Sequence, residues 1–180
     1  MNFRSVHYVL LGILSTEPKH GYQIHKELNA MDGIGAVWKI KITNVYALLD
    51  VLEREGYIRP SKRIEDESGY PPKKFFEITE KGNEIYRSWV HEPVKHGREI
   101  RQVFLSKLFF TQTENKQLAH QLILDQLSEC NRWITNSKPI GEGEGSEFSA
   151  IVESFRSMQI KSYVAWLKEL GKEVEKTLSN

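Results

Sequence analysis

Apolar side chains recur at helical spacing along the first part of the chain. Residues 5–14 place them three and four positions apart, and two further stretches, 21–31 and 41–55, repeat this pattern. Pro18 separates the first stretch from the second, and a turn-forming segment at 32–35 separates the second from the third. The pattern therefore predicts three consecutive helices.

The hydrophobic period changes after the third predicted helix. Residues 57–64 and 73–78 have a strand-like pattern around a Ser-Gly-Tyr-Pro-Pro loop at 68–72, which predicts a β-hairpin with a long tip. Thr79 is a good N-cap for a further helix that ends before Pro93. Three helices, a hairpin and another helix follow the order of a winged helix-turn-helix, whose third helix enters the DNA major groove.

The second half of the chain is helical in its pattern. Residues 100–110 predict a short apolar helix and 114–134 an amphipathic helix, and a segment rich in Gly and Glu at about 137–147 predicts a flexible connection. A long helix is predicted over 148–178, with apolar residues in one stripe. Roughly 30 residues of helix cannot pack along their whole length on so small a body, so a partner helix is expected to cover the stripe.

These elements predict a mainly α fold with a small β-hairpin. We expect a winged helix-turn-helix DNA-binding domain at 1–92 and a helical homodimerisation domain at 93–180. Cys130 lies within an amphipathic stretch, where a small buried hydrophobic residue is expected.

Composition and charge narrow the class of protein. Hydrophobic residues make up 39% of the chain and charged residues 27%, which argues against a largely disordered protein. The net charge is only +1, so a nucleic-acid footprint must come from local clustering, and this balance counts mildly against DNA binding. No run approaches the ~20 apolar residues of a membrane span, and no signal-peptide cleavage site follows the N-terminus. With a single cysteine, these features favour a cytoplasmic protein without membrane contact.

Catalytic, metal and cofactor chemistry has little support in the sequence. The six histidines lack a tight ligand pair, and the one cysteine stands alone. Glycines at 141, 143 and 145 alternate with glutamates, whose charges would repel phosphate, and no Gly-x-Ser-x-Gly motif occurs. We therefore expect no enzyme activity, no metal and no cofactor.

Several segments of the first half resemble the PadR family of transcriptional regulators. In order and spacing the resemblance covers about residues 8–92, and its segments are 8–14, 18–24, Trp38, 45–58 and 73–82. The resemblance implies a winged-helix homodimer that usually represses transcription and often responds to a small, frequently aromatic ligand. The helical second half fits the longer subgroup of the family, whose C-terminal helices dimerise.

The chain departs from the family pattern around the predicted recognition helix. Ala47 stands where a proline is common, which should leave that helix continuous. Lys39 and Lys41 stand where small polar residues are frequent, so the base preference of relatives cannot be transferred to this chain.

Ten residues are candidate DNA contacts. At the start of the recognition helix, lysine supplies charge to phosphate or a donor to guanine, and asparagine can pair with adenine. Two tyrosine hydroxyls can donate to phosphate, and basic residues flank the hairpin tip. These residues are Lys39, Lys41, Thr43, Asn44, Tyr46, Tyr22, Lys62, Arg63, Lys73 and Lys74. The alternatives are a solvated helix start capped by Thr43, tyrosines packed in the core, and hairpin lysines that only protect a strand edge.

Aromatic residues of the later helices are candidates for an effector pocket, because flat aromatic ligands favour such walls. They are Trp89, Phe104, Phe109, Trp133, Tyr163 and Trp166. The alternative is that these side chains serve core and dimer packing.

The leading functional hypothesis is a ligand-responsive repressor that binds double-stranded DNA as a homodimer. Its operator would be an inverted repeat with half-sites about 34 Å apart. The competing hypothesis is a winged-helix dimer that acts in protein interaction without specific DNA binding. The near-neutral charge and the acidic wing tip, residues 65–67, favour the second hypothesis slightly.

Overall fold

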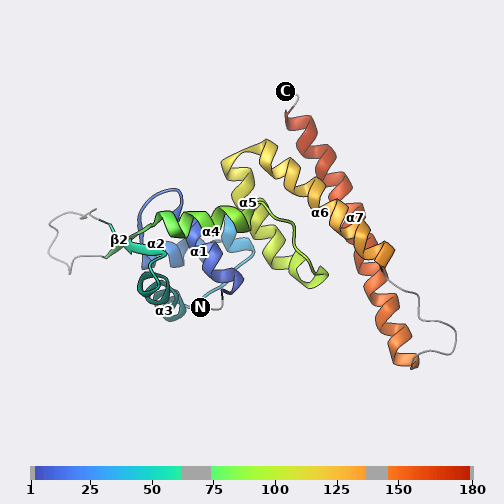
Figure 1. The fold of residues 1–180 in the computed structure, drawn as a ribbon, viewed down its shortest axis with the longest axis horizontal. Coiled ribbons are helices and arrows are strands. Elements are labelled where there is room, and N and C mark those ends of the chain that lie inside the picture. Colours follow the sequence, from blue (N-terminus) through green and yellow to red (C-terminus); the bar gives the residue numbers. More distant parts are fainter. Residues whose placement is uncertain (1–2, 62–73, 137–145, 179–180) are drawn as a thin grey trace. The chain divides into compact units, whose positions relative to one another are not determined.

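The computed structural model describes residues 3–61, 74–136 and 146–178 (Figure 1). The chain forms two compact units. The first contains Met1–Val90 together with Leu105–Phe110, and the second contains His91–Phe104 and Thr111–Asn180. The predicted flexible connection at about 137–147 lies almost wholly outside the described residues.

The first unit is a small helical body with an antiparallel sheet. Its three strands lie in the order β1-β3-β2. The elements are α1 (Ser5–Leu14), β1 (Lys19–His20), α2 (Gly21–Leu28), the 3-10 helix η1 (Gly33–Ala36), α3 (Ile42–Arg54), β2 (Ile58–Pro60), β3 (Phe75–Ile78) and α4 (Glu80–Val90), followed by the first part of α5 (Leu105–Glu114). This order confirms the predicted mainly α fold with a small β-hairpin, to which the structure adds the strand β1.

Periodic apolar positions explain why the first helices form and what they bury. Val9 and Leu10 of α1, like Val45 and Leu49 of α3, are fully buried in the core of the first unit. Thr79 is the predicted cap of α4, and its Oγ1 accepts a hydrogen bond from the backbone N–H of Gly82 at 3.1 Å. The same hydrophobic period that predicts these helices therefore selects the side chains that hold them together.

The first part of α5 belongs to this core. Phe110 lies against Gly12 of α1, so closely that a Cβ at residue 12 would fall 2.7 Å from the Phe110 Cζ atom. Trp38 precedes α3, and its Nε1 donates a 2.7 Å hydrogen bond to Oγ of the fully buried Ser106. Through these contacts α5 helps to fix the position of the segment that leads into α3.

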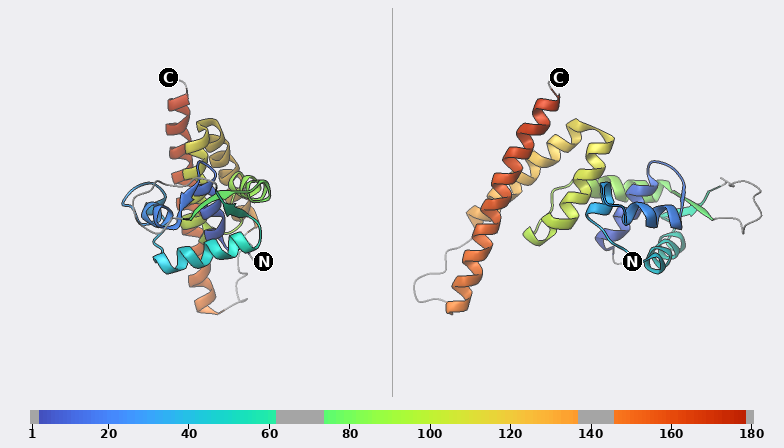
Figure 2. Two further views of the ribbon diagram at one scale, coloured as in Figure 1. Left: turned by 90° about the vertical axis from the view of Figure 1, so that its left-hand side faces the viewer. Right: turned by 180° about the vertical axis from the view of Figure 1, so that it is seen from behind.

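The second unit consists of helices. It contains the 3-10 helix η2 (Gly97–Glu99), the π-helical turn η3 (Ile100–Phe104), the end of α5, α6 (Lys116–Asn136) and α7 (Glu147–Leu178). Helices α6 and α7 lie side by side (Figures 1 and 2). Gly171 of α7 faces α6, where a Cβ would lie 3.6 Å from Cγ2 of Ile123, and the helix continues through this glycine.

Cys130 of α6 is fully buried, as predicted. Burial raises the pKa of its thiol, which keeps the side chain neutral and unreactive. No helix in the described parts of the chain is long and apolar enough to cross a membrane.

Candidate nucleic-acid interface

The start of α3 presents polar side chains to solvent. Helix α3 begins at residue 42, with Lys41 as the N-cap residue, and the side chain of Lys41 makes no capping hydrogen bond. Lys41, Thr43 and Asn44 are exposed, whereas Val45 is fully buried. Because the first N–H groups of a helix lack partners within the helix, this end also favours an anion such as phosphate. Three of the predicted DNA contacts therefore lie on one accessible helix end, and Thr43 is not its N-cap.

Two exposed tyrosines lie near the junction of α2 and α3. The side chain of Tyr46 is 45% exposed, and its ring lies over Gly21, the first residue of α2. Tyr22 is 58% exposed, with its ring centroid 6.3 Å from that of His20. Neither tyrosine is a core residue, so both hydroxyl groups are available for a partner outside the chain.

Two of the predicted lysine contacts have partners within the protein. Lys39 donates through Nζ to the backbone oxygens of Asn29 and Ala30, at 3.2 and 2.9 Å. Lys74 Nζ lies 2.7 Å from Oε2 of Glu53 on α3. These partners cannot be predicted from the local pattern, because they come from other elements of the chain.

The remaining basic residues of the predicted wing lie outside the described residues. They are Lys62, Arg63 and Lys73.

Four of the six candidate effector residues pack against other rings. In the first unit, Trp89 stacks on Tyr8 with ring centroids 5.0 Å apart. The ring centroid of Phe109 lies 5.2 Å from that of Phe110, the next residue of α5. In the second unit, Phe104 meets Trp166 edge-on at 6.0 Å. These contacts agree with the packing alternative for all four residues.

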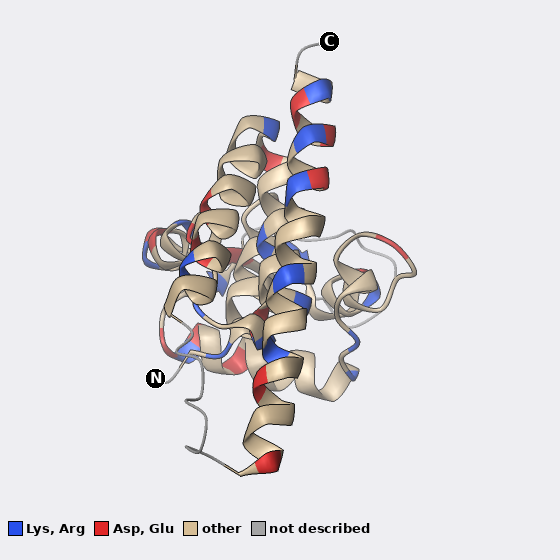
Figure 3. Cartoon of the chain, turned by 90° about the vertical axis from the view of Figure 1, so that its right-hand side faces the viewer, with Lys and Arg blue, Asp and Glu red and all other residues tan. Residues whose placement is uncertain are grey.

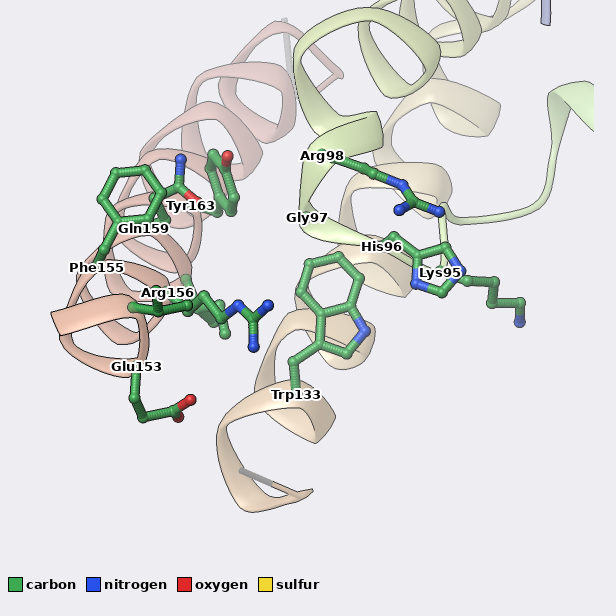
Figure 4. Close-up of a pocket in the computed structure, with 12 residues that line it drawn as sticks. Lys95, His96, Gly97, Arg98, Trp133, Glu153, Phe155, Arg156, Gln159 and Tyr163 are labelled. Carbon is green, nitrogen blue, oxygen red and sulfur yellow. The ribbon is translucent and has the colours of Figure 1, made fainter. Parts of the chain in front are cut away.

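The other two candidates, Trp133 of α6 and Tyr163 of α7, line a cavity of about 730 Å³ in the second unit (Figure 4). The segment around η2 forms the opposite wall, and a Cβ at Gly97 would lie 3.5 Å from Cε2 of Tyr163. The size falls within the range of pockets that hold small ligands. Two of the six predicted aromatic residues, Trp133 and Tyr163, therefore line one cavity, and the other four are not among its lining residues.

The lining of this cavity is mainly cationic, which the sequence pattern did not indicate. Lys95, Arg98 and Arg156 contribute positive charge, and Glu153 contributes one negative charge. Arg156 points towards Trp133, whereas the Lys95 side chain is directed away from it (Figure 4). In the part of the chain that the structure describes, the guanidinium groups of Arg98 and Arg156 have no ion pair or hydrogen bond. An anionic group could pair with either arginine without breaking an interaction between described residues.

Buried polar groups of α6 hold the walls of the cavity in place. Gln126 is fully buried, and its Oε1 accepts a hydrogen bond from the backbone N–H of Val94 at 2.7 Å, while its Nε2 donates to the Val94 oxygen at 3.2 Å. Trp133 Nε1 donates to Oε1 of Glu129 at 3.2 Å, and the other oxygen of Glu129 pairs with Arg132. The indole and the segment after Val94 are therefore fixed before any ligand arrives.

An apolar surface runs along the first half of α7. Phe148, Ile151, Phe155 and Met158 are 71%, 59%, 60% and 69% exposed, and we call them the α7 stripe. Charged residues are sparse in this half of the helix and more frequent towards its C-terminal end (Figure 3). So many large exposed hydrophobic side chains on one helix indicate an interaction surface.

The chain also matches a known protein family. Residues 10–88 match the family model described as the transcriptional regulator PadR-like family. Residues 10–88 therefore form a PadR-like segment of this chain.

One solved structure similar to this PadR-like chain is Bacillus subtilis PadR in complex with operator DNA, which is 23% identical to it. The match covers 95% of this chain and 99% of that chain, with a TM-score of 0.45. The same protein in complex with p-coumaric acid is 22% identical, with 96% and 99% coverage and a TM-score of 0.42. The protein smu.1604c from Streptococcus mutans is 26% identical, with 97% and 98% coverage and a TM-score of 0.42. No curated protein matches the chain.

The PadR-like segment contains every DNA-contact candidate, from Tyr22 to Lys74. The residues that line the cavity follow it in the chain. No cluster of three or more His, Cys, Asp or Glu side chains suited to a metal ion occurs among the described residues of this PadR-like protein.

Proposed function

We propose that this PadR-like regulator binds specific double-stranded DNA through the first turn of α3. The observation that carries the proposal is the exposed polar end of α3, where Lys41, Thr43 and Asn44 surround a helix N-terminus without a side-chain cap. The buried Val45 holds this end on the core of the first unit. A helix that is anchored on one face and polar at its start suits insertion into a major groove.

Each residue has a role that follows from its chemistry. Asn44 reads adenine through its amide, and Lys41 binds phosphate or guanine. The exposed hydroxyls of Tyr22 and Tyr46 donate to the DNA backbone and orient the unit. The basic residues of the wing, Lys62, Arg63 and Lys73, add phosphate contacts in this proposal.

We propose further that the protein acts as a homodimer through the α7 stripe. Burying a large apolar side chain stabilises an assembly by about 1.5–3 kcal/mol, so four of them give a substantial driving force before the cost of association. A two-fold axis would place two α3 helices about 34 Å apart on an inverted repeat.

In this proposal the dimer is a repressor that a small aromatic effector controls. The cavity of the second unit offers Trp133 and Tyr163 for a planar ring, and two guanidinium groups without a partner among the described residues for an acidic substituent. A ligand that binds the DNA-free form more tightly would release the operator.

The test is fluorescence anisotropy with a duplex selected from random sequences and a scrambled control duplex at two salt concentrations. We expect tighter binding to the selected duplex by about 10³-fold or more, falling steeply with salt. Asn44→Ala should relax selection at one base pair by about 1–3 kcal/mol. Gln112→Ala, which removes an exposed amide from α5, should have no effect.

Weak binding that does not distinguish the two duplexes, even at low salt, would contradict the proposal. It would favour instead a winged-helix dimer that acts in protein interaction.

A further inference from the structure

Two side chains tie the end of α2 to the segment that precedes α3. Asn29 Nδ2 donates to the backbone oxygens of His25 and Ile40, both at 2.9 Å. Lys39 Nζ donates to the backbone oxygens of Asn29 and Ala30, at 3.2 and 2.9 Å. We call this pair of side chains, Asn29 and Lys39, the α2–α3 clasp. It holds residue 40 against α2, two residues before α3 begins.

The end of α2 needs such partners. Helix α2 has only eight residues, and the last carbonyl groups of a helix have no partner within it. No residue with positive φ follows the helix directly, since φ of its C-cap Asn29 is −122°. A lysine amine at this end satisfies free carbonyl oxygens and also interacts favourably with the helix dipole. The clasp therefore takes the place of a glycine cap.

The backbone packs closely around the clasp. A Cβ at Gly35 of η1 would lie 2.6 Å from the backbone oxygens of both Ala30 and Glu27. Residues 30 to 40 therefore form a compact turn in which a side chain at position 35 has no room. A turn packed this tightly transmits the position of α2 to the residue that the clasp holds.

The buried Val45 anchors the start of α3 on the core, but Lys41 makes no side-chain capping hydrogen bond there. Lys41 is the N-cap residue, and the residues of the first turn are mostly exposed. The hydrogen bond from Asn29 to the Ile40 oxygen links α2 to the residue that stands two positions before α3.

We propose that Asn29 and Lys39 are positioning residues that set base discrimination by fixing the first turn of α3. In this assignment Lys39 acts through the clasp and not as a phosphate contact. The inference rests on the proposed DNA-binding function. Contacts to base edges tolerate displacements of only a fraction of an ångström. A loosened first turn should therefore lose discrimination between bases before it loses affinity for the DNA phosphate backbone.

The decisive comparison uses Lys39→Met and Lys41→Met in the full-length protein. Each variant removes one lysine charge, and the two positions are only two residues apart in the chain. Lys41→Met should flatten the salt slope of DNA binding by about one unit, as the loss of a phosphate contact predicts. Lys39→Met should leave the slope unchanged and lower the affinity ratio of selected to scrambled duplex by about 10-fold.

Asn29→Ala supplies a second variant that changes no charge. It should lower the same ratio by a similar factor, and the double variant Asn29→Ala/Lys39→Met should lose little more than either single variant. Thermal unfolding of each variant checks that the unit remains folded. A salt slope flattened by Lys39→Met, with an unchanged affinity ratio, would overturn the proposal and make Lys39 a phosphate contact.

Amide hydrogen exchange on the free protein tests the clasp without DNA. The N–H groups of Asn44 and Val45 donate to the Lys41 oxygen at 3.0 and 3.2 Å. Their protection should fall in Asn29→Ala and Lys39→Met but not in Lys41→Met, whereas protection of α1 should stay constant. Unchanged protection in both clasp variants would overturn the positioning role. A wild-type protein that binds no DNA would instead overturn the proposed function, and the exchange result would still decide whether the clasp holds α3.

Discussion

The ring of Tyr46 lies over Gly21, and a Cβ at residue 21 would fall 2.5 Å from its Cε1 atom. Tyr46 belongs to α3 and Gly21 begins α2, so the contact joins the two helices of the helix-turn-helix. Because no side chain fits between them, Gly21 lets an exposed tyrosine lie flat at the proposed DNA surface. The position of the hydroxyl group thus depends on a residue that carries no functional group.

Gly21→Ala should therefore displace the Tyr46 ring and weaken DNA binding about as much as Tyr46→Phe. Gly21 is not among the described glycines with positive φ, and alanine favours helix, so the free energy of unfolding should change by no more than about 1 kcal/mol. Fluorescence anisotropy and thermal unfolding measure the two effects. Full DNA affinity in Gly21→Ala would mean that the Tyr46 hydroxyl does not contact the DNA.

The Lys74–Glu53 ion pair gives a prediction for the wing. Glu53→Gln should free the Lys74 amine, raise DNA affinity and steepen the salt slope by up to about one unit. Glu55→Gln is the matched control, because it removes a carboxylate next to α3 that pairs with Arg54 at 3.8 Å. If both variants changed the slope equally, the effect would be general electrostatics and not release of Lys74.

The hydrogen bond between Trp38 and Ser106 predicts an effect on stability. Ser106→Ala leaves the Trp38 N–H without this acceptor beside a fully buried position, so the free energy of unfolding should fall by about 1–3 kcal/mol. Urea unfolding measures the difference, with the exposed Ser128→Ala as control. A change no larger than that of the control would mean that water replaces Ser106 as the acceptor.

The α7 stripe predicts the oligomeric state. The double variant Ile151→Asn/Met158→Asn should shift the protein from dimer to monomer, because both apolar side chains are exposed on a single chain. Analytical ultracentrifugation across a range of protein concentrations measures this shift. Ser162→Asn, at an exposed position farther along α7, should leave the dimer intact. A dimer that survives the double variant would place the interface elsewhere.

The cationic cavity predicts selectivity for acidic aromatic ligands. 2-Naphthoate should quench tryptophan fluorescence and bind more tightly than its neutral alcohol analogue, since Arg98 and Arg156 have no other partner among the described residues. Arg156→Gln should weaken naphthoate binding by about 10-fold or more. Lys161→Gln removes a charge from α7 outside the cavity and should not. Equal affinity for acid and alcohol would argue against charge recognition.

The elements that follow from a single periodic pattern are predictable from the sequence. The bounds of α1 agree with the pattern at both ends, because ten successive residues keep helical spacing. Helix α2 ends at Leu28, three residues before the predicted end, because Asn29 turns the chain and binds the Ile40 oxygen. Strand β1 has two residues, too few for any alternation to appear, and only its pairing with β3 defines it.

The candidate DNA surface was predictable to the same extent. Polar positions at the start of α3 are visible in the sequence because they interrupt an apolar period. The partners of Lys39 and Lys74 cannot be predicted from the sequence. A lysine close to the predicted recognition helix gives the same sequence pattern whether its amine is free or bound within the protein. The charge of the cavity is not visible in the sequence, because Lys95 and Arg98 come from the segment around η2 whereas Arg156 comes from the distant helix α7.

Helix α5 is divided between the two units, with Leu105–Phe110 in the first and its remaining residues, from Thr111, in the second. The helix is a continuous rod of ten residues, about 15 Å long at 1.5 Å per residue. Phe110 and Ser106 sit on this rod against Gly12 and Trp38. Trp38 stands four positions ahead of α3, so a substitution at Ser106, far along the chain, acts on the segment that leads into that helix.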